Sequence, residues 1–356
     1  MKRALASVLF CASCSSPAVG PDPQQTAVVT ALGVAPAGNY YGMFVLDDPG
    51  LWISVSGPKS ASRGIWEVQK DGSGKRLVVP LANDAADVHF AVDATHVYFA
   101  EGSCEVFRVE KTGGTPTSLG KAGTGDCQAK GLLLANDAVL LATDPGGNPT
   151  PFAPKTSESF ANQASQISSF PKAAGGGGTA LGDPGGQFIC DRTRACMTVL
   201  GDQVFFVHLR SGPGELRALP LAGGTWRSAG TVPSLNTLAG LVGRDTDVFV
   251  ALTDRAPSLR CVVVRVAADG STKTLFDGPY LCGDPKVDAT NLYIGVGTDE
   301  AGGVGVLRQP TDGAPGKILP LGRADFMPRF VMVGPAAFYA AGTSHLVRVS
   351  LSAFSP

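Results

Sequence analysis

Charged residues and histidines are scarce in this chain. Charged residues make up 17% of its 356 residues, and Lys+Arg 29 against Asp+Glu 30 leaves a net charge of −1. This balance provides no basic surface of the kind that nucleic acid or an anionic membrane attracts. The four histidines are His89, His96, His208 and His345, and none lies at the spacing of zinc ligands. We therefore expect no nucleic-acid partner, no metal site and no cofactor.

The apolar run at the N-terminus, Ala4 to Ala12, is too short to cross a bilayer as a helix, which takes roughly 20 residues. Basic residues precede it, which indicates a signal peptide over residues 1–14. The run ends in Ala12-Ser13-Cys14, which resembles a bacterial lipobox and predicts a lipid on Cys14. Cys11 stands where a lipobox usually has Leu, and the alternative is an ordinary secretory peptide cut near Ser16.

Residues 15–25 are rich in Ser, Pro and Gln, and predict a flexible tether before a single domain over residues 26–356. We expect an extracytoplasmic lipoprotein anchored to the membrane, periplasmic or associated with the outer membrane. A secreted protein is the alternative.

What the chain has in abundance is turn residues, Gly 46 and Pro 26, and an internal repeat. Val92-Asp93-Ala94-Thr95-His96-Val97-Tyr98-Phe99 is echoed by Val287-Asp288-Ala289-Thr290-Asn291-Leu292-Tyr293-Ile294. The first apolar residue of the second run in each unit serves as a register mark. These marks are Leu51, Val97, Val139, Val204, Val248, Leu292 and Phe338. Their intervals of 46, 42, 65, 44, 44 and 46 residues indicate units of one length with one long insertion.

Each unit continues with alternating runs joined by Asp-Gly or Gly-Gly, as at Asp71-Gly72 and Gly113-Gly114, which are hairpin signals. Four antiparallel strands in about 40 to 45 residues are typical of a β-propeller blade. We therefore predict an all-β, seven-bladed propeller of four-stranded blades. Thr26 to Leu32 would supply the strand that closes the ring with the last unit. Six blades are the alternative, if the irregular third unit is not a blade.

The pattern resembles bacterial TolB-like and YVTN-like propellers over about Thr26 to Leu351, at the level of fold. It lacks the Gly-His and Trp-Asp pairs of WD40 repeats. The resemblance implies no catalytic residues. An arginine recurs in the third run of several units, as in Arg108, Arg217 and Arg265, and we expect it to bind a neighbouring carboxylate or carbonyl.

Six cysteines remain after the signal peptide, and an even number in an oxidising compartment favours disulfides. Cys104 and Cys127 occupy the same two repeat positions as Cys261 and Cys282. We predict the pairs Cys104–Cys127, Cys261–Cys282 and Cys190–Cys196. All would lie on the face where the first strands begin, called the top face below.

The start of each first strand should also lie at the mouth of the central channel. Charged or polar residues there are Asp87, His89, Lys130, Arg194, Asp284 and Arg329. They could hold a small polar ligand or an anion, or pair among themselves. Two insertions, Asp144 to Gln166 and Gly182 to Ala195, extend the same face.

The sequence shows no catalytic constellation, and function is not settled by fold. The leading hypothesis is a monomeric, non-enzymatic propeller that binds a protein or cell-envelope component through its top face. The alternative is a lyase or hydrolase with its site at the channel mouth.

Overall fold

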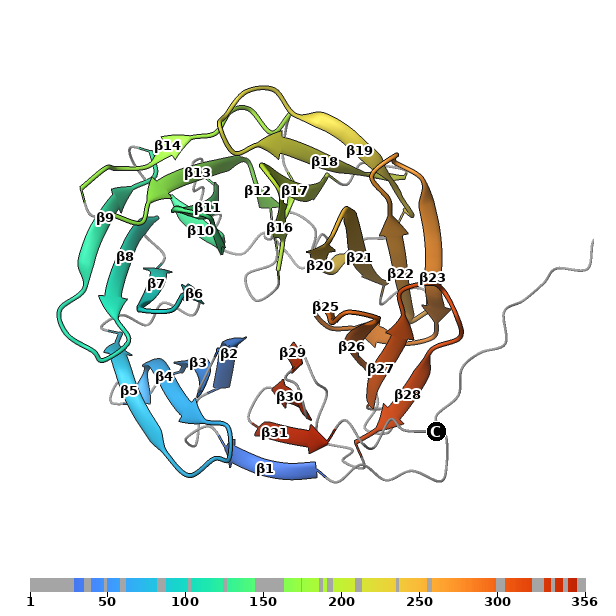
Figure 1. Ribbon diagram of the computed structural model, residues 1–356, viewed down its shortest axis with the longest axis horizontal. Helices are drawn as coiled ribbons and strands as arrows, with labels where there is room; N and C mark the ends of the chain where they lie inside the picture. Colours follow the sequence, from blue (N-terminus) through green and yellow to red (C-terminus); the bar gives the residue numbers. More distant parts are fainter. Residues whose placement is uncertain are drawn as a thin grey trace, which may run out of the picture.

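The structure is a computed structural model in which antiparallel sheets surround a central axis (Figure 1). It describes residues 29–350 apart from a set of short gaps and one longer one. These gaps are 35–39, 48–49, 58–61, 82–87, 102–103, 124–126, 145–162, 174, 186–187, 191–194, 209–212, 235–236, 255–257, 299–304, 322–329, 334–336 and 342–344. The proposed signal peptide, Cys14 and the tether lie outside the described residues.

Blades one to five follow one another along the chain, each with its strands in sequence order from the axis outward. Blade one is β2 (Tyr40–Leu46), β3 (Gly50–Ser56), β4 (Gly64–Gln69) and β5 (Lys75–Pro80). Blade two is β6 (His89–Val92), β7 (His96–Glu101), β8 (Glu105–Glu110) and β9 (Thr117–Lys121). Blade three is β10 (Gln128–Ala135), β11 (Ala138–Asp144), β13 (Gln166–Pro171) and β14 (Thr179–Ala180). Blade four is β16 (Met197–Leu200), β17 (Gln203–His208), β18 (Gly214–Pro220) and β19 (Arg227–Val232). Blade five is β20 (Thr237–Arg244), β21 (Asp247–Asp254), β22 (Arg260–Val266) and β23 (Thr272–Gly278).

Two further sheets complete the ring. The split sheet contains β24 (Leu281–Cys282), β25 (Lys286–Val287), β26 (Asn291–Gly297), β27 (Gly305–Pro310) and β28 (Lys317–Pro320). The closing blade contains β29 (Phe330–Val333), β30 (Ala337–Ala341), β31 (His345–Ser350) and, from the other end of the chain, β1 (Val29–Val34). β1 pairs antiparallel with β31, so strands from both ends of the repeat close the ring, as the sequence predicts.

The expectation of seven four-stranded blades is wrong. In the part of the chain that the structure describes, six sheets of the ring have four strands, and the split sheet has five. Its inner position is divided between β24 and β25, which both pair with β26. The interruption falls at Asp284-Pro285, because proline has no N–H to donate to the ladder and the Asp284 carboxylate bonds to another blade instead.

The repeat itself has the register that the sequence indicates. Each register mark is the second residue of the second strand of its sheet, from Leu51 in β3 to Phe338 in β30. These second strands lie inside their sheets and bury side chains on both faces, as in β21. Apolar residues of adjacent sheets pack together, and Trp52 and Ile65 of blade one join Phe90 and Phe99 of blade two in one cluster.

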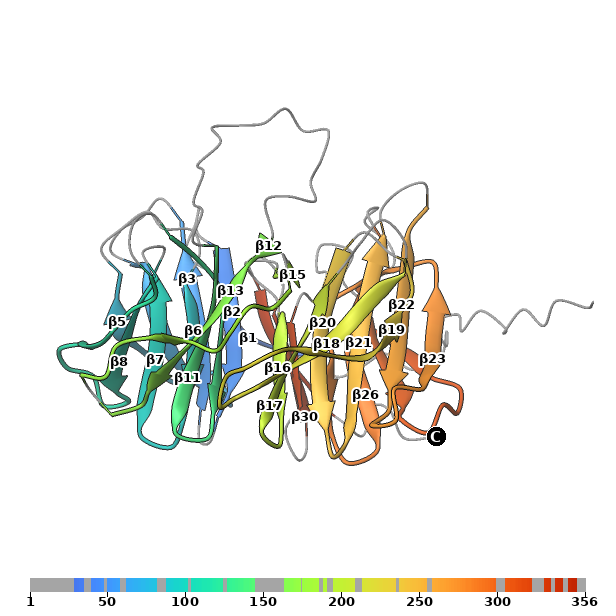
Figure 2. The ribbon, with the colours of Figure 1, turned by 90° about the horizontal axis from the view of Figure 1, so that it is seen from above.

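The long third unit has an addition that the sequence does not reveal. β12 (Gln163–Ala164) pairs with β15 (Phe188–Ile189) in a two-stranded sheet, so the two insertions join each other. Figure 2 shows this small sheet at the upper edge of the ring. Phe188 is buried and its ring centroid lies 4.8 Å from that of Phe206 in β17. The insertions are therefore fixed to blade four at their base.

The echoed Asp and Tyr of the repeat form one hydrogen-bonded turn. Asp93 Oδ1 accepts hydrogen bonds from the backbone N–H of Thr95 and of His96, and its Oδ2 accepts one from the Tyr98 hydroxyl at 2.9 Å. Asp288 and Tyr293 repeat this arrangement in the split sheet. Burial works against ionisation of Asp93, but the hydrogen bonds and the nearby Lys172 outweigh it and hold the pKa at about 2.

We expect the Asp93 carboxylate in this turn to make the free energy of unfolding depend on pH. A carboxyl with a lowered folded-state pKa stabilises the fold above its unfolded pKa, and the contribution disappears as pH falls towards 2. Asp93→Asn should lower the free energy of unfolding by about 1 kcal/mol at pH 7, a figure reduced for partial solvent exposure. The difference from the parent should vanish near pH 2 in urea titrations by circular dichroism. A difference that stays constant down to pH 2 would contradict the assigned cause.

Candidate functional site

The links between blades and the bends between second and third strands share the top face, while the other two hairpin turns of each blade lie on the bottom face. This follows from the antiparallel order of the strands. Figure 2, with the ring seen from the side, places the β12–β15 sheet at the top edge. The top face therefore carries the longer connections, which is where binding residues on a rigid scaffold usually lie.

Three disulfides fasten this face, with the pairing that the sequence predicts. Cys104–Cys127 joins the entry to β8 to the link before β10, and Cys261–Cys282 joins β22 to β24. Cys190–Cys196 lies in the link that enters blade four. Three disulfides in one domain are typical of an oxidising compartment outside the cytoplasm. Among the described residues, no helix is long and apolar enough to span a membrane.

Three of the six predicted channel-mouth residues fall within the described part of the chain. His89, Lys130 and Asp284 are 1%, 2% and 4% exposed. Asp87, Arg194 and Arg329 lie outside the described residues. His89, Lys130 and Asp284 therefore lie within the wall of the channel and are engaged in internal contacts. A ligand at the channel mouth stays a prediction.

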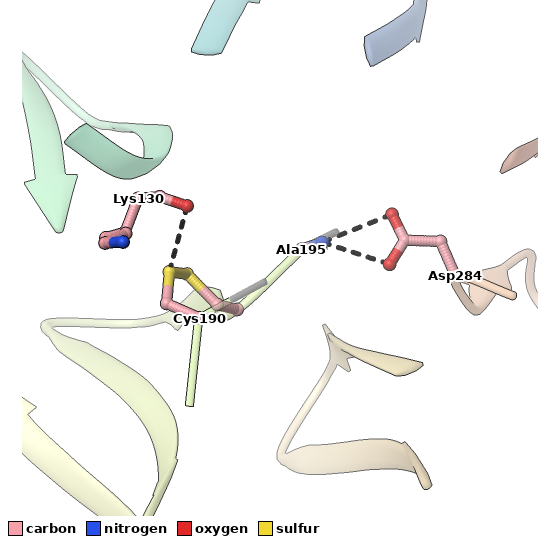
Figure 3. The surroundings of a disulfide bond; sticks show 5 residues. Lys130, Cys190, Ala195 and Asp284 are labelled. Atoms are coloured by element: carbon pink, nitrogen blue, oxygen red, sulfur yellow. Dashed lines mark hydrogen bonds between the residues drawn. A yellow bond between two sulfur atoms is a disulfide. The ribbon is translucent and has the colours of Figure 1, made fainter. Parts of the chain in front are cut away.

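Lys130 lies in β10 where the ladder with β11 is irregular, since Ala129 pairs with Thr143 and Gly131 pairs with Ala142. The Lys130 ammonium donates a hydrogen bond to Gln128 Oε1 at 2.8 Å. The backbone carbonyl oxygen of Lys130 lies 3.2 Å from the sulfur of Cys190 (Figure 3). A disulfide sulfur carries no proton, so this is a packing contact. A Cβ on Gly131 would lie 2.6 Å from Cys196 Sγ, so the disulfide requires a glycine here.

Asp284 joins three consecutive sheets. Its carboxylate accepts hydrogen bonds from the backbone N–H of Ala195, at 3.0 Å to Oδ1 and 3.3 Å to Oδ2 (Figure 3). The Lys286 ammonium lies 3.8 Å from Oδ2. Between them lies β20 of blade five, whose Leu241 N–H donates to the carbonyl of Ala195. Asp284 thus has a structural partner on the link into blade four.

The sequence pattern could have revealed this packing. Gly131, Cys196, Gly240 and Asp284 each lie eight residues before their register marks, Val139, Val204, Val248 and Leu292. The side chain of Cys196 packs against Gly131, and the side chain of Asp284 packs against Gly240. Each glycine thus leaves space for the side chain at the same repeat position of the next sheet. A Cβ on Gly240 would lie 2.1 Å from Asp284 Oδ1. The regular offset is visible in the sequence, but which neighbour fills the space depends on the closed ring.

Gly240→Ala should therefore displace the Asp284 carboxylate from Ala195. We expect a loss of about 1 to 3 kcal/mol in the free energy of unfolding, as for other overpacked sites. A double-mutant cycle with Asp284→Ala, measured by urea denaturation, isolates the clash. The double variant should be more stable than the sum of the single effects predicts. Additive effects would show that Gly240 serves another purpose.

The recurring arginines of the third strands have the structural partners that we expected. Arg108 donates to the carbonyl of Lys172 at 2.6 Å, and Arg265 pairs with Asp247 at 2.8 Å. Arg217 donates to the carbonyls of Pro184 and Gly185, both at 2.8 Å. The latter two belong to the Asp183-Pro184-Gly185 turn, in which Asp183 Oδ1 accepts from the Gly185 N–H. Among the described residues, no three His, Cys, Asp or Glu side chains gather as metal ligands would.

Comparison with known proteins defines the class of the fold. No protein-family model matches the chain, and no curated protein matches it in sequence. Several solved structures are similar to it over nearly their whole length. Virginiamycin B lyase from Staphylococcus aureus, solved with quinupristin, has a TM-score of 0.64 at 12% identity, covering 91% of this chain and 99% of that one. YCF48 bound to D1 peptide has a TM-score of 0.62 at 10% identity, covering 95% and 99%.

YCF48 from Cyanidioschyzon merolae is similar at a TM-score of 0.58 and 11% identity, covering 91% of this chain and 98% of that one. At such low identity these likenesses show the β-propeller fold alone. The chain is a β-propeller protein, and its neighbours in structure have varied functions. The narrower resemblance to TolB-like lipoproteins receives no support from them.

Proposed function

We propose that the chain is a non-enzymatic, extracytoplasmic propeller that binds a protein or a cell-envelope component through its top face. The observation that carries the proposal is the set of three disulfides, which all fasten the links and bends of that one face. A fixed surface loses little conformational entropy when a partner binds, and this favours recognition by preformed connections.

Two further observations agree with a binding role. The described polar residues of the channel mouth are buried in the wall, and Asp284 holds blades together. The structural neighbour YCF48 was solved with a bound peptide, which shows that a propeller of this general shape can serve as a receptor. The alternative, a lyase or hydrolase at the channel mouth, has two neighbours in its favour by fold, virginiamycin B lyase and, over 55% of its length, a puromycin-hydrolysing peptidase. None of the described contacts supports it.

Site-specific photo-cross-linking in the native cell envelope tests the proposal. A photoreactive amino acid is placed at three exposed top-face positions, Lys121, Gln128 and Arg260, and at three bottom-face controls, Asp71, Glu110 and Asp312. We expect one discrete cross-linked product from the top-face positions, and we expect that product to be missing from the controls. The same product from both faces, or none from the top face, would overturn the assignment.

The proposed lipid anchor has a separate test. Cys14→Ala should move the protein from the membrane fraction to the soluble fraction of the envelope, because the acyl chain on Cys14 would be its only attachment. Cys11→Leu is the matched control, since it removes the other cysteine of this segment, supplies the residue that a lipobox usually has, and should leave fractionation unchanged. A Cys14→Ala protein that stays with the membrane would contradict lipidation.

A further inference from the structure

On the bottom face, aromatic rings of two blades lie beneath a lysine of the following blade. Lys111 Nζ lies 5.9 Å from the centroid of the Trp52 ring, and the same ammonium pairs with Asp47. Lys172 Nζ lies 5.9 Å from the Tyr98 ring and 3.6 Å from Asp93 Oδ2. Each arrangement combines a cation–π contact with a carboxylate. We call such a place an interblade slot.

The repeat defines the members of each slot. Trp52 and Tyr98 directly follow the register marks Leu51 and Val97, and Phe205 holds the same position after Val204. Lys111 follows Glu110, the partner of His96 in the ladder between β7 and β8. In blade five, Val266 pairs with the mark Val248 as Val109 pairs with Val97. Val-Glu-Lys-Thr-Gly at 109–113 therefore aligns with Val-Ala-Ala-Asp-Gly at 266–270, and Ala268 is the counterpart of Lys111.

The ring of Phe205 consequently has a methyl group where a lysine would lie. Trp52, Tyr98 and Phe249 are 1%, 2% and 0% exposed, whereas Phe205 is only half-buried. Phe249 is covered in another way, by the guanidinium of Arg244, whose Cζ lies 5.8 Å from the ring centroid. In blade three the residue at the ring position is Leu140, and the residue of blade four that corresponds to Lys111 is Leu221. Both belong to one apolar cluster. The slot between blades four and five combines an aromatic ring with a residue too short to cover it.

A cavity of about 290 Å³ opens at this slot. Its apolar lining includes Phe205, Leu216, Val248 and Ala268. Three charged residues line it: Asp202, Asp245 and Arg227. Arg227 donates to Gln203 Oε1 at 2.7 Å, and Asp245 accepts from Arg244 at 3.1 Å. Asp202 lies in the turn between β16 and β17, the counterpart of the turn that contributes Asp93 to the slot of blade two.

We propose that the slot between blades four and five binds the side chain of a lysine from a partner protein. An alkylammonium group suits both parts of the site, because its methylene stem can pack on Phe205 and Val248 while the charge faces the ring and the carboxylates. The same chemistry occupies two other slots of this molecule, each time with a lysine presented by a hairpin turn. A lysine of a partner segment would occupy this slot as Lys111 and Lys172 occupy the other two. This site lies on the face opposite the one proposed above and is independent of it.

Amide NMR spectra of the full-length protein test the chemistry. Nα-acetyl-lysine methylamide is the probe, and Nα-acetyl-norleucine methylamide, which lacks the ammonium, is the control. We expect the lysine probe to bind about 5-fold more tightly, as a partly exposed cation–π contact allows, and to shift the signals of Phe205, Thr246 and Ala268. Butylammonium should bind more weakly than the lysine probe. Equal affinity for the lysine and norleucine probes would overturn the site, and butylammonium binding as tightly as the lysine probe would overturn a protein segment as its occupant.

Two variants locate the contact. Phe205→Leu keeps an apolar wall without the ring and should abolish the preference for lysine over norleucine. Ala268→Lys restores the pattern of the other slots and should weaken the lysine probe at least about 10-fold, because the internal ammonium competes at high effective concentration. Ala268→Ser, which cannot reach the ring, should bind like the parent. A lysine preference that survives both Phe205→Leu and Ala268→Lys would contradict the proposal even if every variant folds.

Discussion

Arg217→Met should be the most destabilising single substitution among the described polar residues, lowering the free energy of unfolding by about 3 kcal/mol or more. The Arg217 side chain is 0% exposed, and its Nε lies 2.9 Å from Glu215 Oε2. Its Nη1 donates to the carbonyls of Pro184 and Gly185, and its guanidinium stacks on Trp226, with Cζ 3.7 Å from the ring centroid. Methionine would fill part of the volume, but it would remove the donor of these two carbonyls and the cation beside the Glu215 carboxylate.

The consequences should extend beyond blade four, because Arg217 fixes the link that leaves blade three. A Cβ on Gly185 would lie 2.1 Å from Trp226 Nε1, so the turn is held against the Trp ring on one side and Arg217 on the other. Arg217→Lys should recover little, since a lysine cannot serve two carbonyls, a carboxylate and an aromatic face in one plane.

Arg265→Met is the matched control. Arg265 belongs to the third strand of blade five, is 36% exposed and pairs with Asp247 at 2.8 Å. Its partner Asp247 is only 9% exposed, but water reaches the Arg265 guanidinium, so the control should lose less than Arg217→Met in the same urea titration. Losses of equal size would mean that burial of Arg217 does not decide its contribution.

The sequence placed Arg217 among the third-strand arginines without showing that it differs from them. Arg108 and Arg265 each precede the residue that pairs with the register mark, whereas Arg217 lies one position earlier. Because strand side chains alternate, one position moves Arg217 to the opposite face of its sheet. The shift can be counted in the sequence. Burial of the guanidinium, however, depends on Trp226 and on the turn at Pro184. The repeat period does not predict the path of either segment.

The same distinction applies to the ring and to the channel mouth. Strand order, register and the closing strand follow from period and alternation, because these are local properties of each unit. Division of the split sheet at Pro285 and pairing of β12 with β15 depend on contacts between distant units. His89 and Lys130 lie in first strands, and Asp284 lies at the interruption between β24 and β25. A repeat position alone does not show whether a side chain turns into the channel or into the wall.

Removal of either disulfide that closes a long loop should also lower the free energy of unfolding strongly. Each of the pairs Cys104–Cys127 and Cys261–Cys282 closes a loop with a sequence separation of 23 or 21, whereas Cys190–Cys196 has a separation of 6. On the loop-entropy relation, removing either long pair should cost about 3 kcal/mol and removing the short pair about 2 kcal/mol. The comparison uses three double alanine variants in urea under oxidising conditions.

The ranking, rather than the absolute values, separates two explanations of these losses. If chain entropy dominates, the two long pairs should be equally costly, since their separations are nearly the same. If packing dominates, Cys190–Cys196 should cost as much as either, because its sulfurs fill the space over Gly131 and both of its cysteines are buried. Gly131→Ala in the Cys190→Ala/Cys196→Ala background then decides the matter. The added methyl should recover stability if an empty space is the cause, and should have no effect if the loss is entropic.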